Sequence, residues 1–376
     1  MERKRVPLGN YITEYSVRNR SGEDIPVYSV TNSQGFCTEY FDKEVASKDK
    51  TTYKIVPRGY FAYNPSRINV GSVDWQRCEG RVIVSPLYNV FSVSEKMEQQ
   101  YLFYFLKSNV GRQMIKAKAS GSVRDNLKMD MLKEMTIPER TIEEQKKCVA
   151  TLDALKTIIS LWEKELEKLD ELIKARFVEL FGHQSHNEKS LPYMTIDDVA
   201  EIYLGITHTP IYVDSGVMFI SAKNTSGDFL DLSDVKYISR EEFEGAPKGS
   251  KPQVNDVLFS RVGSNLGHPV ILEEELELCT FVSLGFLRSK GIVTSNYLKH
   301  WMRDEFFAKQ VSEHVKGGGQ PNLNTGWLKE FKIIVPGLEG QKEFDDFCKQ
   351  VDKSKVIDIN IILKGGVYNG NEFFVS

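Results

Sequence analysis

The sequence predicts a protein of the α/β (α+β) class, in which two similar mixed domains follow one another with a long helix between them. Three features indicate this: a repeat with a spacing of 196 residues, β-rich runs with an amphipathic helix in each half, and a heptad pattern between the halves. Because this period is far longer than a solenoid repeat, it indicates duplication of a whole domain with its connector. We expect a first domain at 1–140, a long helix at 141–182, a second domain at 183–337, a second helix at 338–355 and a divergent tail at 356–376.

The repeat is clearest between segments 126–147 and 322–343. Seven residues recur there at the constant spacing of 196 positions. They are Asn126, Leu127, Leu132, Lys133, Glu134, Ile137 and Gln145 in the first copy, and Asn322, Leu323, Leu328, Lys329, Glu330, Ile333 and Gln341 in the second. The same spacing pairs basic Lys107 with basic Arg303, whereas 28–35 faces 220–227 at a spacing of 192. This drift predicts short insertions in loops.

Composition is that of a soluble globular protein. Hydrophobic residues make up 41% and charged residues 27% of the 376 positions, which is ordinary for folded domains. No apolar run reaches the roughly 20 residues of a membrane helix, and the opening segment has no signal-peptide core. The five cysteines are widely spaced, as reduced thiols are in a cytoplasmic protein. We therefore expect a cytoplasmic location without membrane contact.

Positive charge is concentrated in the first domain. Residues 1–140 contain 22 Lys and Arg against 16 Asp and Glu, whereas residues 183–336 contain 15 against 20. Because the second domain is acidic as a whole, any contact it makes with a nucleic acid has to use a local patch.

A continuous helix is predicted after Pro138. Thr141 and Glu144 have the spacing of a capping box, which marks a helix start, and Gly182 is a typical stop. Apolar residues between them alternate at intervals of four and three, as in a coiled coil that needs a partner helix. This seam consists of Cys148, Leu152, Leu155, Ile159, Trp162, Leu166, Leu169, Ile173, Phe177 and Leu180. At a rise of about 1.5 Å per residue, the helix is roughly 60 Å long.

The second copy of this helix starts in the same way and then departs from the pattern. Phe344, Cys348 and Val351 continue the seam, but Lys355 takes the place of Ile159. The segment 356–376 is typical of a short strand, a Gly-Gly turn and a tail, so we expect a second helix much shorter than the first. Two explanations stay open: a divergent C-terminus, and a truncated or frame-altered helix.

Each domain carries a polar loop after a β-rich run and a Gly- or Ser-rich turn before the repeated Asn-Leu pair. Arg, Asn and Gln match the hydrogen-bonding edges of guanine and adenine, while Lys, Ser and glycine-rich backbone suit phosphate oxygens. The candidate DNA-contacting residues are Asn64, Ser66, Arg67, Asn69, Ser122 and Arg124 in the first domain, and Lys223, Asn224, Arg261, Ser264, Asn265, Lys316 and Gln320 in the second. One such loop alone is better explained as an ordinary turn. Its presence in both halves favours binding.

No catalytic centre is visible in the sequence. The segment 63–67 approaches the Asn-Pro-Pro-Tyr box of adenine methyltransferases, but Ser66 and Arg67 replace its last two residues, and no Gly-rich cofactor turn accompanies it. The turn at 316–320 lacks the Lys-Ser/Thr end of a P-loop. His183 and His186 have no acidic partner at metalloprotease spacing. We therefore expect no catalytic residue and no metal site.

These features together resemble the specificity subunit of type I restriction–modification systems. The resemblance rests on the repeated Asn-Leu and Leu-Lys-Glu segment, the Gln at the following helix start, the heptad helix and the loop at 63–72, and it covers residues 1 to about 353. It implies that each domain is a target recognition domain for one half of a split, asymmetric DNA site. It also implies that the two helices pack antiparallel as a spacer, with pseudo-two-fold symmetry.

The resemblance further implies that partners supply the chemistry. In such systems the specificity subunit is not an enzyme. Two adenine-methylating modification subunits dock on it, and restriction subunits add ATP-driven translocation and cleavage of double-stranded DNA. S-adenosylmethionine, ATP and Mg²⁺ are then expected in those partners, and no cofactor in this chain. Docking and coiled-coil contacts are expected at Leu152, Leu155, Ile159, Trp162, Leu166, Leu169, Ile173, Phe344 and Val351.

The shortened second helix leaves three expectations for the uncovered seam. A second copy of the chain covers it by self-association, the modification subunit covers it, or the subunit is impaired. Two other classes of function remain as alternatives. A self-contained DNA enzyme would need a cofactor loop or carboxylate cluster, which the sequence lacks. A coiled-coil scaffold that binds proteins is distinguished by the absence of salt-dependent binding to duplex DNA.

Overall fold

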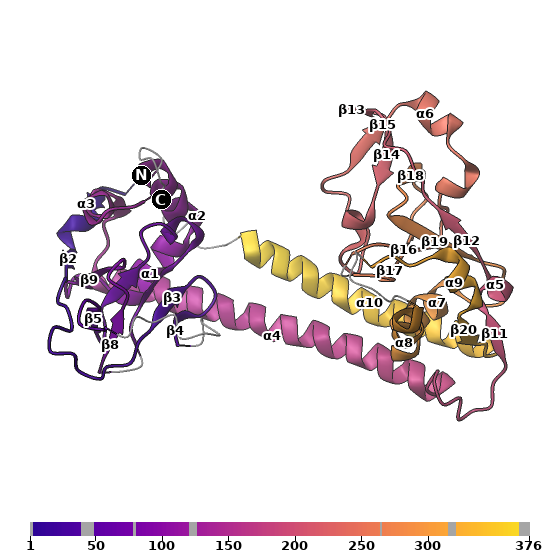
Figure 1. The fold of residues 1–376 in the computed structure, drawn as a ribbon, viewed down its shortest axis with the longest axis horizontal. Helices are drawn as coiled ribbons and strands as arrows, with labels where there is room; N and C mark the ends of the chain where they lie inside the picture. Colours follow the sequence, from indigo (N-terminus) through magenta and orange to yellow (C-terminus); the bar gives the residue numbers. More distant parts are fainter. Residues whose placement is uncertain are drawn as a thin grey trace. The chain divides into compact units, whose positions relative to one another are not determined.

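A computed structural model describes residues 3–38, 49–77, 80–119, 126–263, 265–314 and 321–367, with the backbone alone for 356–367. The chain divides into two compact units, one formed by 1–163 with 359–376 and the other by 164–358. Each unit contains one mixed domain of strands and short helices (Figure 1). The expected α+β class is confirmed.

The first domain is built on an antiparallel four-stranded sheet of order β2-β9-β6-β7. These strands are β2 (Ile12–Glu14), β9 (Asn89–Val93), β6 (Phe61–Tyr63) and β7 (Val73–Trp75). Three antiparallel pairs surround it: β1 (Arg5–Pro7) with β10 (Thr136–Pro138), β3 (Ser29–Thr31) with β4 (Gly35–Cys37), and β5 (Lys54–Pro57) with β8 (Arg81–Val84). The helical elements are η1 (Leu8–Asn10), η2 (Ile68–Val70), α1 (Gln99–Lys107), α2 (Asn109–Ala119) and α3 (Met129–Lys133).

The second domain repeats this sheet and adds another. Its antiparallel sheet of order β12-β19-β16-β17 consists of β12 (Ala200–Leu204), β19 (Leu284–Ser289), β16 (Val257–Ser260) and β17 (Pro269–Ile271). The added sheet has the order β13 (Tyr212–Val213), β15 (Lys236–Ile238), β14 (Val217–Ile220) and β18 (Leu278–Thr280), with β14 and β18 parallel. A further pair joins β11 (Tyr193–Thr195) to β20 (Lys332–Ile334). The helical elements are α5 (Ile196–Val199), η3 (Ala222–Thr225), α6 (Arg240–Gly245), η4 (Lys248–Ser250), α7 (Ser295–Met302), α8 (Glu305–His314) and α9 (Thr325–Glu330).

The repeated Asn-Leu pair closes the core of each domain in the same way. Leu127 and Leu323 are fully buried, and each donates its backbone N–H to the loop that follows the central strand. The acceptor is the carbonyl of Pro65 at 3.1 Å in the first domain and of Arg261 at 2.8 Å in the second. These acceptors are also 196 residues apart, so the repeat reflects a conserved packing arrangement between the two copies.

The amphipathic helix expected in each domain is broken in two. In the first domain Ser108 leaves the helical conformation between α1 and α2, and its hydroxyl accepts the N–H of Gly111 at 3.1 Å. In the second domain the Asp304 carboxylate accepts the N–H of Phe306 at 2.8 Å, just after α8 begins. A side chain that satisfies a free N–H at a helix start favours a new helix there.

The long helix α4 (Ile142–Phe181) confirms the expected connector of 40 residues. Its capping box forms as predicted, because Glu144 accepts the N–H of Thr141 at 2.9 Å and Thr141 accepts the N–H of Glu144 at 3.3 Å. The Thr141 N–H and the Arg3 guanidinium hold the pKa of the Glu144 carboxyl at about 2. Gly182 follows the helix with φ +75°, a conformation that suits glycine at a helix end.

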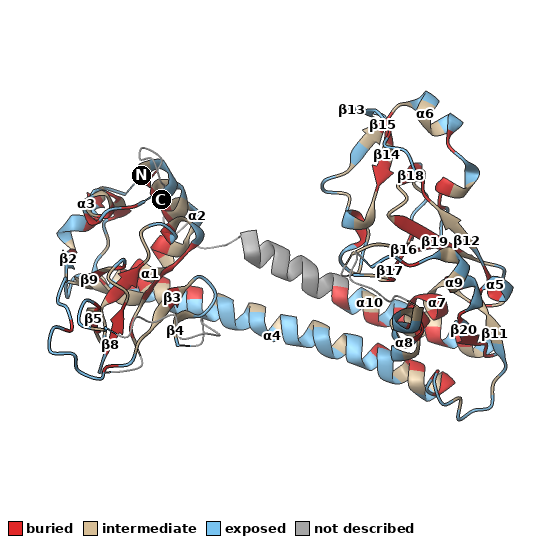
Figure 2. Ribbon diagram, viewed as in Figure 1, coloured by how far each residue is buried: buried red, intermediate tan, exposed pale blue. Residues whose placement is uncertain are grey.

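The seam of α4 is shared between the two units. Cys148 and Leu152 pack into the core of the first domain, whereas Ile173, Phe177 and Phe181 pack into the core of the second. The expected seam residues Leu155, Ile159, Trp162, Leu166 and Leu169 are half-buried. Figure 2 shows that the middle of α4 is mostly exposed, with intermediate positions between. The apolar stripe therefore anchors the helix to its own domains at both ends.

Within the second unit, α4 and α10 (Leu338–Val367) pack antiparallel. Phe181 lies against Gly340 and Phe177 against Phe344, while Asp170 pairs with Lys355. Residue numbers increase along α10 in the direction in which they decrease along α4. The antiparallel spacer expected from the resemblance is therefore present in this unit.

The expected end of the second helix at residue 355 was wrong, because α10 continues to Val367. Once a helix is nucleated, each further residue adds a backbone hydrogen bond, and Val or Ile lowers helix propensity by less than about 0.7 kcal/mol. The short strand expected after residue 355 is therefore helical. The remaining tail, 368–376, lies outside the described residues.

Candidate nucleic-acid interface

The candidate site in the first domain is the segment 64–72, which we call recognition loop 1. It joins the central strand β6 to the edge strand β7 and contains the helical turn η2. Ser66 and Arg67 are exposed on it, whereas Asn64 and Asn69 are half-buried. The loop is held from below by Ile68, which is 1% exposed and belongs to the domain core.

Three of the four predicted residues in recognition loop 1 shape the turn itself. The Asn64 side chain accepts the N–H of Ser66 at 3.1 Å and its hydroxyl at 2.9 Å. The Asn69 side chain accepts the N–H of Val70 at 2.9 Å. Asn and Ser are common in turns for this reason. Arg67 is the exposed charged side chain of this loop, and its contact with DNA bases stays a prediction.

The corresponding segment of the second domain, 261–268, is recognition loop 2. Arg261 does not project from it. Its guanidinium donates to the carbonyls of Leu323 at 3.2 Å and Val282 at 3.0 Å, and burial lowers its pKa. Arg261 therefore fastens the loop to the repeated Asn-Leu pair, and the expectation that it contacts DNA is not supported. Asn265 is exposed and donates to the carbonyl of Ser226 at 3.3 Å.

Asn224 is also committed to the fold. It is 3% exposed, its side-chain oxygen accepts the N–H of Ser221 at 3.0 Å, and its amide donates to Asp231 at 2.9 Å. Because the side chain is buried, its amide is not accessible to a base edge, and the expectation that Asn224 contacts DNA is not supported. Its neighbour Lys223 is exposed and forms an ion pair with Asp234 at 2.8 Å.

Five predicted DNA-contacting residues lie outside the described residues: Ser122, Arg124, Ser264, Lys316 and Gln320. The exposed candidates that the structure describes are therefore Ser66 and Arg67 in the first domain, and Lys223 and Asn265 in the second.

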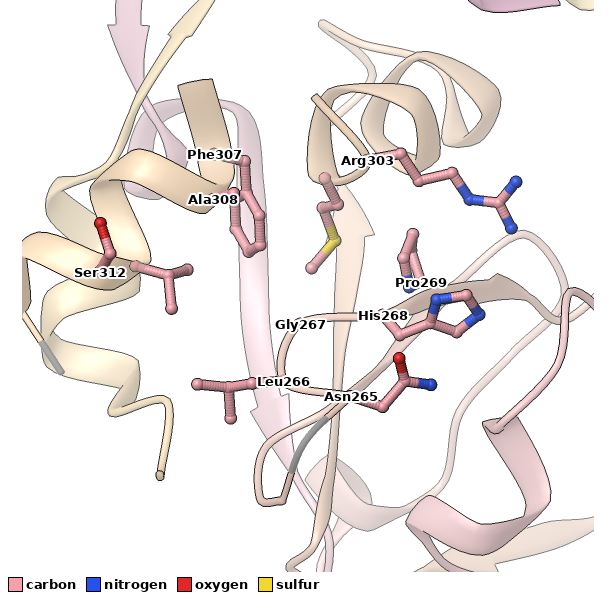
Figure 3. A pocket seen from close by; sticks show the side chains of 11 residues that line it. Asn265, Leu266, Gly267, His268, Pro269, Arg303, Phe307, Ala308 and Ser312 are labelled. Carbon is pink, nitrogen blue, oxygen red and sulfur yellow. The ribbon is translucent and has the colours of Figure 1, made fainter. Parts of the chain in front are cut away.

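A pocket of about 570 Å³ separates recognition loop 2 from helices α7 and α8. Figure 3 shows Arg303, His268 and Asn265 on one side of it, and Phe307, Ala308 and Leu266 on the other. In the first domain, η2 of recognition loop 1 packs directly against α2. The two loops thus rest differently on otherwise similar domains.

Sequence reasoning missed a cationic and aromatic cluster near β7 and α1. The Arg77 guanidinium lies 4.1 Å above the Trp75 ring and 5.4 Å from the Phe103 ring, and it pairs with Asp74 at 2.8 Å. The spacing Asp-x-x-Arg after a strand is too common to reveal such a cluster. Stacked aromatic and guanidinium groups are able to bind nucleic-acid bases.

Four of the nine residues expected at a docking surface are buried in the cores of the chain's own domains. Leu152, Ile173, Phe344 and Val351 are at most 8% exposed and lie in the domain cores. A partner therefore has no access to them. Three large apolar residues of α4 outside the predicted seam are exposed instead: Ile158, Leu161 and Leu172.

Two further searches cover only the part of the chain that the structure describes. No group of three His, Cys, Asp or Glu residues there is arranged to hold a metal ion. No helix there is both long enough and apolar enough to cross a membrane.

Comparison with protein families gives a match to the type I restriction modification DNA specificity domain. It covers residues 8–171 and again 191–362, so each copy of the repeat is matched separately. The two matches coincide with the two structural copies of the domain and its following helix.

Among characterised relatives, the chain is similar to two archaeal proteins from Methanocaldococcus jannaschii. It is 20% identical over 288 residues to the type I restriction enzyme MjaVIII specificity subunit, covering 72% of this chain and 67% of the relative. It is 22% identical over 258 residues to the MjaIX specificity subunit, covering 63% of this chain and 58% of the relative. The StySPI specificity subunit of Salmonella potsdam is 23% identical over 147 residues, which are 38% of this chain and 32% of that relative.

Two solved structures share the fold across nearly the whole chain. A chain from a study of complex assembly and conformational transition in the type I R-M system has a TM-score of 0.61 at 17% identity, covering 98% of this chain and 96% of that one. The type I restriction–modification S subunit from M. genitalium has a TM-score of 0.52 at 13% identity, covering 98% and 94%.

Proposed function

The chain belongs to the type I restriction–modification DNA specificity family, as a specificity subunit, and we propose that its two domains each read one half of a split, asymmetric DNA site. One observation carries this proposal: the two family matches fall on two copies of one fold whose recognition loops differ in sequence and in packing. Two different readers in one chain predict two different half-sites.

The recognition loops carry the side chains that such reading needs. Arg67 is exposed on recognition loop 1, and Lys223 and Asn265 are exposed on or beside recognition loop 2. Arginine matches guanine, and asparagine matches adenine, through paired donors and acceptors in the major groove. We assign base reading to Arg67 and Asn265, and phosphate contact to Ser66 and Lys223.

In this proposal the subunit works in the cytoplasm within a larger complex and performs no catalysis of its own. Two modification subunits methylate adenine with S-adenosylmethionine, and restriction subunits use ATP and Mg²⁺. We propose the exposed residues Ile158, Leu161 and Leu172 of α4 as apolar contacts for a partner subunit.

The test is co-expression with the cognate modification subunit, followed by mapping of methylated adenines across the host genome. We expect a split motif with two unlike halves that disappears when this chain is omitted. Binding of the purified complex to duplex DNA should also fall steeply with salt, because bound cations displace counterions from the phosphates. Methylation without a motif dependent on this chain, or binding insensitive to salt, would contradict the proposal.

A further inference from the structure

Lys107 and Arg303 occupy the same place in the two copies of the domain. They are 196 residues apart, which is the spacing of the repeat. Lys107 is the last residue of α1, and Arg303 directly follows α7. Both side chains point into the region between two loops of their own domain, and neither is fully exposed.

In the first domain the Lys107 ammonium joins recognition loop 1 to the turn at 32–34 between β3 and β4. It donates to the carbonyl of Gly71 at 2.5 Å, and to the backbone and side-chain oxygens of Asn32 at 3.0 and 3.1 Å. The ammonium also lies 5.6 Å from the centre of the Phe103 ring. One half-buried cation therefore holds two loops through three acceptors.

Gly71 makes this junction possible. Its φ of +97° is a left-handed conformation that favours glycine. A Cβ atom at this position would lie 2.2 Å from the Asn32 side-chain oxygen and 3.3 Å from the Lys107 ammonium. A side chain at this position would strain the left-handed backbone and displace the Asn32 side chain from the Lys107 ammonium.

In the second domain Arg303 has different partners and is linked to recognition loop 2 through Asp228. Its guanidinium pairs with Asp228 at 2.7 Å, in the segment 226–235 that follows η3. Asp228 lies 3.9 Å from the imidazole of His268 in recognition loop 2, and that imidazole lies 3.0 Å from the carbonyl of Gly227. Figure 3 shows Arg303 and His268 next to each other on the same side of the pocket.

We propose that Lys107 and Arg303 are positioning residues for DNA reading, each fixing the recognition loop of its domain against a neighbouring loop. The inference rests on the proposed function, because it assigns a purpose to the order of these loops. A side chain discriminates between bases only when its backbone holds it in one geometry. The cation acts through the loop and does not itself touch a base.

The experiment selects bound sequences from a randomised duplex library with the complex of this chain and its modification subunit. Lys107→Met removes the charge and keeps the aliphatic stem, while Lys107→Arg introduces the cation that the second domain uses. Arg303→Met and Arg303→Lys are the reciprocal pair. Lys4→Met, at an exposed lysine of the same unit, controls for loss of one charge.

We expect Lys107→Met to reduce the sequence preference in one half of the selected motif. Most of the roughly 5- to 150-fold preference per position that a paired base contact gives should be lost there. The sequence preference in the other half and the slope of affinity against salt should not change. Lys107→Arg should retain the motif in both halves. Arg303→Met should blur the opposite half. If Lys107→Met does not fold, Asn32→Ala removes an acceptor at an exposed position and should blur the same half.

Three outcomes would overturn the inference. An unchanged motif in Lys107→Met shows that the tie does not order the loop. Equal weakening of both halves with a shallower salt slope identifies Lys107 as a phosphate contact, since each lost contact lowers the slope by about one. An equal loss of sequence preference in Lys107→Arg and Lys107→Met shows that a positive charge at this position does not order the loop. A wild-type complex that selects no split motif refutes the proposed function instead, before any variant is compared.

Discussion

Gln145 and Gln341 make the same three hydrogen bonds in the two domains, 196 residues apart. Both are buried, at 1% and 0% exposure. The side-chain oxygen of Gln145 accepts the N–H of Glu98 at 2.9 Å, and its amide donates to the carbonyls of Lys96 at 2.9 Å and Arg140 at 3.0 Å. Gln145 thus joins the start of α4 to the start of α1.

Gln341 repeats this arrangement at the start of α10. Its oxygen accepts the N–H of Thr294 at 2.8 Å, and its amide donates to the carbonyls of Ile292 at 3.2 Å and Pro336 at 2.9 Å. Each long helix is therefore fixed to its domain by one buried amide, which explains why glutamine recurs in the repeat.

Gln145→Leu should lower the free energy of unfolding of the first unit by at least about 1–3 kcal/mol, because it leaves buried backbone groups without a partner. Chemical denaturation followed by circular dichroism measures this loss. Gln113→Leu, at an exposed glutamine of α2, is the matched control and should change stability by less than roughly 0.5 kcal/mol. Equal effects of the two substitutions would contradict the assignment.

Phe344→Ala should be among the most destabilising changes in the second unit. The Phe344 ring is fully buried against Phe177, Phe181 and His300, with ring centres 5.1 to 5.7 Å apart. Truncating a buried phenylalanine costs about 3–5 kcal/mol through lost burial and the cavity left behind. Leu338→Ala, at an exposed position of the same helix, should cost far less when unfolding is measured in parallel.

His300 is half-buried where α7 packs against α4 and α10. Its imidazole is 3.9 Å from the Cys348 thiol and packs edge-on against Phe344. Burial holds its pKa well below the usual 6.5, and the positive charges of Lys299, Arg303 and Lys355 add to this. His300 also lines a second pocket, together with Glu167, Asp170, Glu171 and Lys174 of α4.

The second unit should therefore lose stability as the pH falls below about 6.5. The unfolded chain takes up a proton on His300 in that range, whereas the folded chain does not. The contribution is thus complete above the unfolded pKa and declines below it, with a slope that approaches about 1.4 kcal/mol per pH unit. Denaturation across pH 5–7 should show a flatter dependence for His300→Phe, which keeps an aromatic ring. An identical pH dependence in this variant would assign the effect to other groups.

Arg67→Ala should relax recognition in one half of the DNA site and leave the other half intact. A guanidinium that pairs with guanine gives about 1–3 kcal/mol of discrimination, which the alanine variant would lose. Mapping of methylated adenines or selection from a randomised library measures this directly. Arg58→Ala, an exposed arginine of the same domain, should leave the motif unchanged. Equal weakening of both halves by Arg67→Ala would indicate a phosphate contact or misfolding.

Features governed by near neighbours in the sequence were predictable. The capping box of Thr141 and Glu144 and the full extent of α4 depend on residues within a few turns of one another, and both formed as expected. The end of α10 was mispredicted from local propensity, since Val- and Ile-rich segments are typical of strands. Helix growth from the preceding turns decided it instead.

Which polar side chains remain accessible to DNA was not predictable, because the groups that bind them inside the protein are distant in the sequence. Arg261 bonds to the carbonyl of Leu323, 62 residues away, and its half-buried guanidinium is thereby held against the backbone. Asn224 is enclosed by Asp231 and Ser221, whereas Arg67 is left exposed on a loop of similar composition. Composition suggests which side chains suit DNA; packing decides which of them can reach it.

The sequence by itself determined the duplication, the long helix with its start and seam, and the family to which the repeated segments belong. The duplication and the helix follow from periodicity and spacing, which survive in the linear order of residues, whereas the family was indicated by the resemblance of the repeated segments. Tertiary structure alone decided which loop residues remain exposed, that Lys107 ties two loops together, and that Arg303 pairs with Asp228 beside His268. Such contacts depend on hydrogen bonds between segments that only the folded chain brings within about 3 Å of each other.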